Sequence, residues 1–309
     1  MAVTAATLTG DFAGFLTPDR AQGIFDRAEK ASVVQGLVQK VPLGANGVEI
    51  PVITGRPTVG WVAEAGQKPA SKGSMALKTI SPKKAAAIVV TSAEVVRANP
   101  GGYIDKIRPQ LGEAFAMAFD RAALYDKGPD GTAGAGPFAS WINQTTKAVE
   151  IGTTAAAGGG IHGDLTAALS LLVAAGKKLT GWAVDDQFEP LLEGAADTTG
   201  RPLYVDLPSE TDNSGLTARG RLLRRPSLMT EGVASADAAK VLGFGGDWRE
   251  AAWGVVGGIS YDVSTQATVT INGALVSLWE NNLVAIRAEA EYGFLVNDPE
   301  AFVRLTNAV

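Results

Sequence analysis

The sequence predicts an α+β protein in which a long β-hairpin, one long helix and a strand-rich C-terminal part follow one another along the chain. Two apolar segments, VEIPVITG from Val48 and MALKTISPKKAAAIVVT up to Thr91, flank a stretch rich in Gly, Pro and Ser, which is typical of a hairpin. The segment YIDKIRPQLGEAFAMAFDRAALYDKG from Tyr103 repeats apolar residues at spacings of three and four, as on one face of a helix. Beyond Ala251, AAWGVVGGISYDVST and LVAIRAEAEYGFLVN are typical of strands.

The composition limits the classes of protein to which the chain can belong. With 309 residues, 46% of them hydrophobic and 19% charged, it is long enough for about two domains and too apolar to be disordered. It has no cysteine and a single histidine, His162, which excludes disulfides, thiolate nucleophiles and any zinc site that needs two imidazoles. The N-terminus lacks the pattern of a secretory signal, and no segment approaches the length of a membrane span.

The hairpin expected over residues 48–92 carries apolar residues on both faces, whereas a ribbon solvated on one side should alternate. In its first arm, Val48, Ile50 and Val52 point one way and Ile53 points the other. An isolated hairpin of this kind is marginally stable in water and leaves unpaired strand edges. The segment therefore needs a second surface, and its length favours a surface on another subunit.

Positive charge is concentrated on the same segment. Between Ile50 and Val90 six basic residues stand against one acid, a net of +5, so the remainder of a chain of net charge −5 carries −10. Lysines that keep a strand edge soluble are one explanation. The other is that a basic arm lies on the acidic body of a neighbouring copy, where complementary charge would steer assembly. The basic residues are Arg56, Lys68, Lys72, Lys78, Lys83 and Lys84, and the acid is Glu64.

The other elements are predicted from local signals on both sides of the hairpin. The tripeptide TPD at Thr17 supplies a cap, a proline at the first helical position and an acid, so a short amphipathic helix is expected from there to Val34. TSAEVVRANPGG predicts a short helix, and Pro109 must either begin or kink the long helix after it. Residues 139–246 predict a mixed α/β region, TVTINGALVSLW from Thr268 belongs to the strand-rich final part, and DPEAFVRLT predicts one more short strand.

Taken together, the order of these elements and several short motifs resemble the major capsid proteins of tailed bacteriophages with the Hong Kong 97 fold. The resemblance spans nearly the whole chain, and its specificity lies in the order and spacing of motifs that are individually weak. In chain order they are SVVQGLVQKVPL, IPV, WVAEAGQKPASK, ISPKK with VVTSAEVV, FDRAALYDKG, GDW near Gly246, and AIRAEAEYGFLVNDPEAFVRL.

The resemblance implies a domain organisation for the chain. The expected units are an N-terminal arm (1–47), an extended E-loop hairpin (48–92), a peripheral domain with a spine helix (93–138), an axial domain (139–250), returning strands of the peripheral domain (251–292) and a C-terminal strand packing on the axial domain (293–309). It also implies a structural function without catalysis or cofactors. Hexamers and pentamers would form an icosahedral shell in the virion, assembled in the bacterial host cytoplasm. That shell would enclose double-stranded DNA without sequence-specific binding and would meet portal, scaffolding or decoration proteins of the same phage.

Some members of this family cross-link a hairpin lysine to an asparagine of a neighbour with the help of a glutamate. The corresponding candidates are Lys68 or Lys72 as the amine and Asn282 with Glu289, which stand at the family's spacing. An odd separation places the last two on opposite faces of a strand, so they would serve two different linkages. The alternative is a solvated strand face. The residues expected to contact another subunit are Arg56, Trp61, Glu64, Lys68, Lys72, Lys78, Lys83 and Lys84.

Three other functions compete with this expectation. An encapsulin-type compartment has the same fold, but the long arm and the hairpin sequence favour the phage family. An α/β ligand-binding protein or hydrolase would have to use His162 beside Asp164, and a loop histidine that caps the following helix is the simpler interpretation. Nucleic-acid recognition is disfavoured because the pI is near 5.1 and no basic stripe lies outside the hairpin.

Overall fold

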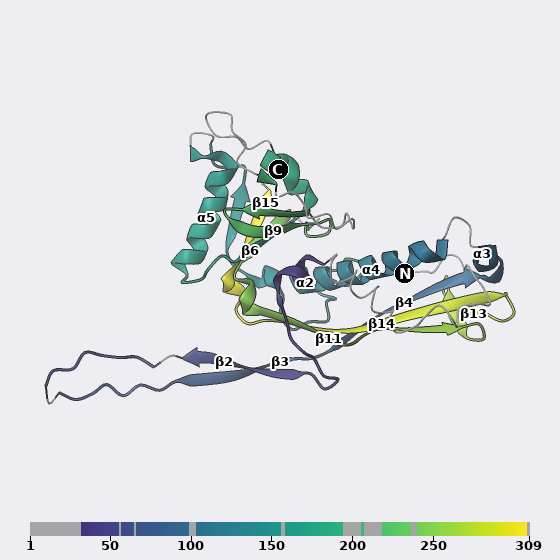
Figure 1. Cartoon of the computed structure of the whole chain (residues 1–309), viewed down its shortest axis with the longest axis horizontal. Coiled ribbons are helices and arrows are strands. Elements are labelled where there is room, and N and C mark those ends of the chain that lie inside the picture. The colour runs from purple at the N-terminus through teal and green to yellow at the C-terminus, as the bar shows by residue number, and fades with distance from the viewer. Residues whose placement is uncertain are drawn as a thin grey trace.

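The computed structural model describes residues 32–55, 57–64, 66–98, 103–155, 158–193, 205–206, 218–235 and 240–307. Figure 1 shows an elongated molecule with a slender hairpin that leaves the body at one end. The body has two parts, one built on a long helix and a four-stranded sheet, and one built on a seven-stranded sheet. Most of the helix expected after Thr17 lies outside the described residues, and the first described helix is α2 (Val33–Leu37).

The first part of the body consists of the long helix packed on the four-stranded sheet. Helix α4 (Tyr103–Tyr125) is confirmed as predicted, and Pro109 lies inside it instead of beginning it. The sheet has the order β1-β11-β14-β4, with the bounds Gln39–Lys40, Ala251–Ser264, Leu283–Val296 and Lys83–Ser92. Phe119 of α4 contacts Tyr292 of β14 with ring centroids 5.3 Å apart, so the apolar stripe of the helix faces the centre of the sheet.

The far end of this part carries a short helix and a small hairpin. Helix α3 (Ala93–Ala98) is confirmed, and it follows directly on β4. The strand-rich segment from Thr268 forms two strands, β12 (Thr268–Ile271) and β13 (Ala274–Ser277), which pair with each other. Asn272 and Gly273 both have positive φ, at 51° and 82°, as the two-residue turn of a tight hairpin requires.

The second part of the body is the seven-stranded mixed sheet with helices against it. Its strand order is β5-β15-β10-β6-β9-β8-β7. The strand bounds are Ala148–Ile151, Phe302–Asn307, Val241–Gly246, Gly181–Val184, Arg225–Met229, Ala218–Leu222 and Val205–Asp206. Helix α5 (Gly160–Ala174) buries Leu165 and Leu172 with the sheet residues Val303 and Leu305. Helix α6 (Glu189–Glu193) follows β6 through a short 3₁₀ turn, η5 (Asp186–Phe188).

Short 3₁₀ helices and helix α2 connect the parts. The remaining 3₁₀ elements are η3 (Ile142–Gln144), η6 (Trp248–Glu250) and η7 (Pro299–Ala301). Asp120 of α4 accepts hydrogen bonds from Ser32 Oγ at 2.5 Å and from the Val33 amide at 2.9 Å, which holds the start of α2 on the long helix. Desolvation by burial raises the pKa of Asp120 to about 7.

The hairpin itself is shorter than the sequence predicted. Strand β2 (Val48–Gly55) pairs antiparallel with β3 (Ser74–Ile80), and these two strands form a sheet of their own. The expectation that residues 83–92 complete the returning arm is wrong, because β4 pairs along its whole length with β14 of the body. The apolar residues on both faces of β4 therefore follow from its place in the body and not from a partner subunit.

Candidate assembly surface

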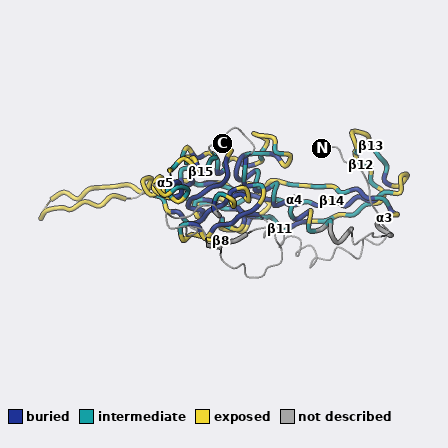
Figure 2. Tube along the Cα trace, turned by 90° about the horizontal axis from the view of Figure 1, so that it is seen from above, coloured by how far each residue is buried: buried dark blue, intermediate teal, exposed yellow. Residues whose placement is uncertain are grey.

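The segment between β2 and β3 is exposed, and the two strands expose most of their residues, with Val48, Ile50 and Val52 on one face of β2 half-buried. Figure 2 shows the projecting hairpin in the colour of exposed residues along nearly its whole length. Its apolar side chains are not covered by the rest of the chain: Val59 is 97% exposed, Trp61 106%, and Met75 and Leu77 are each 66% exposed. Contiguous apolar exposure of this kind in a soluble chain marks a surface that is covered by another molecule.

The base of the hairpin, in contrast, is anchored firmly in the body. Ile80, the last residue of β3, is 1% exposed and lies against Gly293 of β14. A Cβ at position 293 would lie 2.5 Å from the Ile80 side chain, so only glycine allows this approach. Lys78 donates a hydrogen bond to the carbonyl oxygen of Asn297, which ties β3 to the end of β14. The hairpin therefore starts from a fixed origin while its tip reaches into solvent.

The structure divides the expected basic residues into two groups. Lys68 and Lys72 are exposed near the tip of the hairpin, whereas Lys83 and Lys84 stand at the start of β4 on the body. Lys84 Nζ lies 2.9 Å from Glu289 Oε2 of β14, so part of this charge is neutralised within the chain. Arg56 lies outside the described residues.

The two cross-link candidates of the C-terminal part are separated along β14. Asn282 precedes the strand with a φ of 53°, and its Nδ2 donates to Glu94 Oε1 at 2.7 Å. The argument from alternating strand faces therefore does not apply to it. Glu289 lies within β14 and pairs with Lys84 and Arg287. Seven residues of strand place the two about 20 Å apart, so one lysine of a neighbouring chain cannot contact both.

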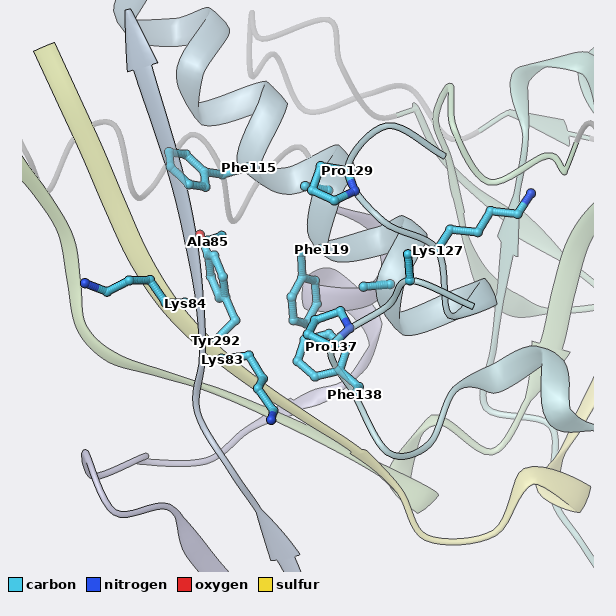
Figure 3. A pocket seen from close by; sticks show the side chains of 13 residues that line it. Lys83, Lys84, Ala85, Phe115, Phe119, Lys127, Pro129, Pro137, Phe138 and Tyr292 are labelled. Carbon is cyan, nitrogen blue, oxygen red and sulfur yellow. The ribbon is translucent and has the colours of Figure 1, made fainter. Parts of the chain in front are cut away.

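A groove opens on the body between α4, the start of β4 and the loop after α4. Its aromatic lining comes from Phe115 and Phe119 of α4, Phe138 of the loop and Tyr292 of β14, and the cavity measures about 230 Å³. Phe119 holds this lining together, with ring centroids 5.8 Å from Phe138 and 5.3 Å from Tyr292. Figure 3 shows Lys83 at the edge of the groove, while the amines of Lys84 and Lys127 point outward.

Two smaller apolar surfaces lie elsewhere on the molecule. At the far end of the four-stranded sheet, Leu275 and Trp279 are 79% and 75% exposed. On the outer side of α5, Leu171 and Val173 are exposed as well. The tryptophans differ in burial, since Trp182, Trp248 and Trp253 are buried, whereas Trp61 and Trp279 are exposed.

The residues on which an enzyme would depend are not arranged as a catalytic site. His162 lies in the first turn of α5, so its interpretation as a loop residue is wrong, and its side chain is exposed. Asp164 turns the other way and accepts hydrogen bonds from the Gly152 and Thr154 amides. In the described part of the chain, no three His, Cys, Asp or Glu side chains gather as metal ligands, and no helix is long and apolar enough to span a membrane.

A subunit that exposes apolar side chains on a projecting β-ribbon, and whose body offers an apolar groove, has the features of a self-associating structural protein. The chain belongs to the phage capsid family, whose model matches residues 13–307. It is 46% identical to the probable major capsid protein gp17 of Mycobacterium phage L5, over 97% of this chain and 92% of that protein. The gp17 protein of Mycobacterium phage D29 is 44% identical, over 97% of this chain and 93% of that protein.

Solved structures share the fold at low sequence identity. A chain from Gordonia phage Cozz superposes with a TM-score of 0.72 at 24% identity, covering 90% of this chain and 87% of that one. A chain from Mycobacterium phage Ogopogo gives the same TM-score and identity, covering 90% and 92%. The predicted Hong Kong 97-type α+β fold and the predicted family are therefore confirmed. The protein is a structural component of the virion capsid and not an enzyme, and the encapsulin and hydrolase alternatives are not favoured.

Proposed function

We propose that the chain builds hexamers and pentamers of an icosahedral shell through a head-to-tail contact, in which the hairpin of one subunit lies across the body of the next. The observation that carries this proposal is the hairpin with a buried base at Ile80 and fully exposed apolar residues at its tip. A surface on one side of a subunit that fits a different surface on the other side generates a closed ring when the rotation between neighbours divides a full turn evenly. Fivefold and sixfold rings of one chain are the units from which such a shell closes.

We further propose roles for the parts of the body within such a ring. The seven-stranded sheet with α5 corresponds to the axial domain around the ring centre, and α4 with the four-stranded sheet to the peripheral domain. The exposed Leu171 and Val173 of α5 would then be covered by neighbouring axial domains, and Leu275 with Trp279 by contacts between rings. The acidic body, with its pI near 5.1 for the whole chain, suits an inner wall to which packed double-stranded DNA does not adhere.

The proposal includes partners of the same phage and a place of assembly. Scaffolding, portal and decoration proteins would meet this shell, and assembly would take place in the cytoplasm of the bacterial host. A covalent bond between Lys68 or Lys72 and Asn282 of a neighbour, assisted by Glu289 of another chain, stays a prediction. Denaturing electrophoresis of mature particles tests that bond, since a single band at the 31.8 kDa of one chain contradicts it.

Size-exclusion chromatography and negative-stain electron microscopy of the purified chain test the proposed assembly. We expect rings or closed shells that appear with rising protein concentration. A chain that stays monomeric under every condition of salt, pH and crowding, and that binds a small ligand saturably, would overturn the proposal. Shells of uniform size that contain no DNA and form only around a co-purifying protein would favour the encapsulin-type function instead.

A further inference from the structure

We propose that the tip of the hairpin docks into the aromatic groove of a second copy of this chain, with Trp61 entering the groove and Glu64 facing Lys83 on its edge. This inference rests on the proposed function, because it names the contact by which the hairpin of one subunit would hold the next. In this contact Trp61 is the anchor and the aromatic groove is its receptor. The ion pair between Glu64 and Lys83 fixes the register.

The receptor is a preformed apolar cavity that matches one large side chain. Phe115, Phe119, Phe138 and Tyr292 are themselves at least nine-tenths buried, so their positions are set by the core and not by an incoming group. Phe119 and Phe138 meet edge to face at 71°, and such an arrangement leaves ring faces and edges for a further aromatic ring. The cavity of about 230 Å³ accommodates a single indole but not a helix or a strand.

The tip of the hairpin carries an aromatic side chain and an acid, which complement the aromatic lining and the lysine of the groove. The Gly66 amide donates to the Ala63 carbonyl oxygen at 2.9 Å and reverses the chain there, so Glu64 stands in the terminal turn and Trp61 lies three residues before it. Trp61 is 106% exposed and makes no contact that would have to be broken before docking. Glu64 is the one acid between Ile50 and Ile80 in the sequence. A single carboxylate beside an aromatic anchor complements a lysine beside an aromatic groove.

A chain cannot fill its own groove with its own tip. The groove begins at Lys83, three residues beyond the buried end of the hairpin at Ile80. From Ile80 the extended chain runs 16 residues to Glu64, a reach of about 50 Å, and Figure 1 shows it leading away from α4 and β14. The occupant must therefore come from another copy, one whose own hairpin points toward this body.

Trp279 is the competing aromatic occupant, because it is also exposed and is followed by the acid Glu280. It lies in the turn between β13 and β14, next to Leu278, which is fully buried. Because Trp279 stands on a short turn at the end of a sheet, it cannot enter the groove unless the sheet itself contacts the walls of the groove. A slender ribbon meets no such obstacle, which favours Trp61.

Cross-linking tests the contact directly, because the chain has no cysteine of its own. The variant Glu64→Cys/Lys83→Cys keeps Trp61 in place and is treated with a short bis-maleimide after assembly. We expect a ladder of covalent oligomers on denaturing gels, at least tenfold stronger than with either single cysteine variant. Adding Trp61→Ala to the pair should remove the ladder. The matched control is Glu280→Cys/Lys83→Cys, which should give only the background of the single variants.

The outcomes separate this inference from the proposed function. Shells without the Glu64–Lys83 ladder overturn the inference and leave the assembly function intact, and a ladder from the Glu280 pair assigns the groove to Trp279 instead. A chain that forms no rings or shells at all overturns both. Charge reversal gives an independent measurement: Glu64→Lys and Lys83→Glu should each slow assembly about two- to fivefold, and the double variant should restore the rate. Additive effects of the two changes would contradict the proposed ion pair.

Discussion

Replacing Trp61 with alanine should abolish assembly without lowering the stability of the isolated chain. The side chain is 106% exposed in the single chain, so its truncation removes no buried area and the free energy of unfolding should change by less than about 0.5 kcal/mol. If it becomes buried between subunits, an aromatic residue covers about 150–250 Å², which corresponds to roughly 4–6 kcal/mol at about 25 cal/mol per Å². Part of that gain offsets the ordering of the tip, which leaves about 2–4 kcal/mol lost per contact.

Ile80→Ala is the matched control, because Ile80 lies on the same hairpin but is 1% exposed. Its truncation should cost the single chain about 2–5 kcal/mol. Differential scanning fluorimetry at concentrations below assembly gives the stability of both variants, and light scattering gives their assembly. We expect an unchanged melting temperature with no scattering for Trp61→Ala, and a lowered melting temperature for Ile80→Ala. A Trp61→Ala chain that assembles at the normal concentration would refute the argument from exposure.

Three further predictions concern charge, pH and packing. Raising the salt concentration should slow assembly, measured by light scattering, since attraction between exposed charges is screened over about 8–10 Å; rates that do not depend on salt would leave apolar contact alone to guide it. Because the pKa of Asp120 is raised to about 7 in the fold, the folded chain holds a proton that the unfolded chain releases, so its stability should fall by about 2 kcal/mol between pH 5 and pH 7. Denaturant unfolding of Asp120→Asn should show no such fall in stability between pH 5 and pH 7. An equal fall would mean that another group titrates. Gly245→Ala should lower the unfolding free energy by about 1–3 kcal/mol, because its Cβ would lie 2.4 Å from the Trp182 ring, whereas the same change at the open Gly44 should have little effect on the melt.

The local pattern of apolar and polar residues was sufficient to predict most elements of the fold. The three- and four-residue spacing of apolar side chains located α4 to within two residues of its ends, and alternation located β14. The error at β4 has a physical cause, because an apolar strand does not specify which strand it pairs with. Pro82 has no amide hydrogen to donate and stands between β3 and β4, which is the signal that the returning arm ends at Ile80. Asn272 with Gly273 was a similar signal for the turn between β12 and β13.

The candidate surface was only half predictable. The hairpin was found because its composition conflicts with a solvated ribbon, and Trp61, Glu64, Lys68 and Lys72 do lie on it. The groove could not be found, since its lining joins Lys83, Phe119 and Tyr292, which are far apart in the sequence and meet only through the pairing of β4 with β14. The role of Asp120 could not be predicted either, because in the sequence it only lies off the apolar stripe of α4. It is buried because it caps α2, a contact between segments 88 residues apart.

The direction of the hairpin is set by the body before any partner arrives. Lys78 at its base donates to the Asn297 carbonyl oxygen, and Asn297 Nδ2 donates to Glu250 Oε2 at 2.6 Å. Lys177, just after α5, lies 3.5 Å from Glu250 and 2.6 Å from Asp298, and hydrogen bonds to Asp298 and the charges of both acids raise its pKa against the opposing effect of desolvation. The hairpin, the four-stranded sheet and the seven-stranded sheet thus meet in one polar cluster. An arm whose origin is fixed in this way loses less conformational freedom on docking than a flexible tail, so its apolar tip is presented at one place relative to the body, and identical subunits can select one ring geometry.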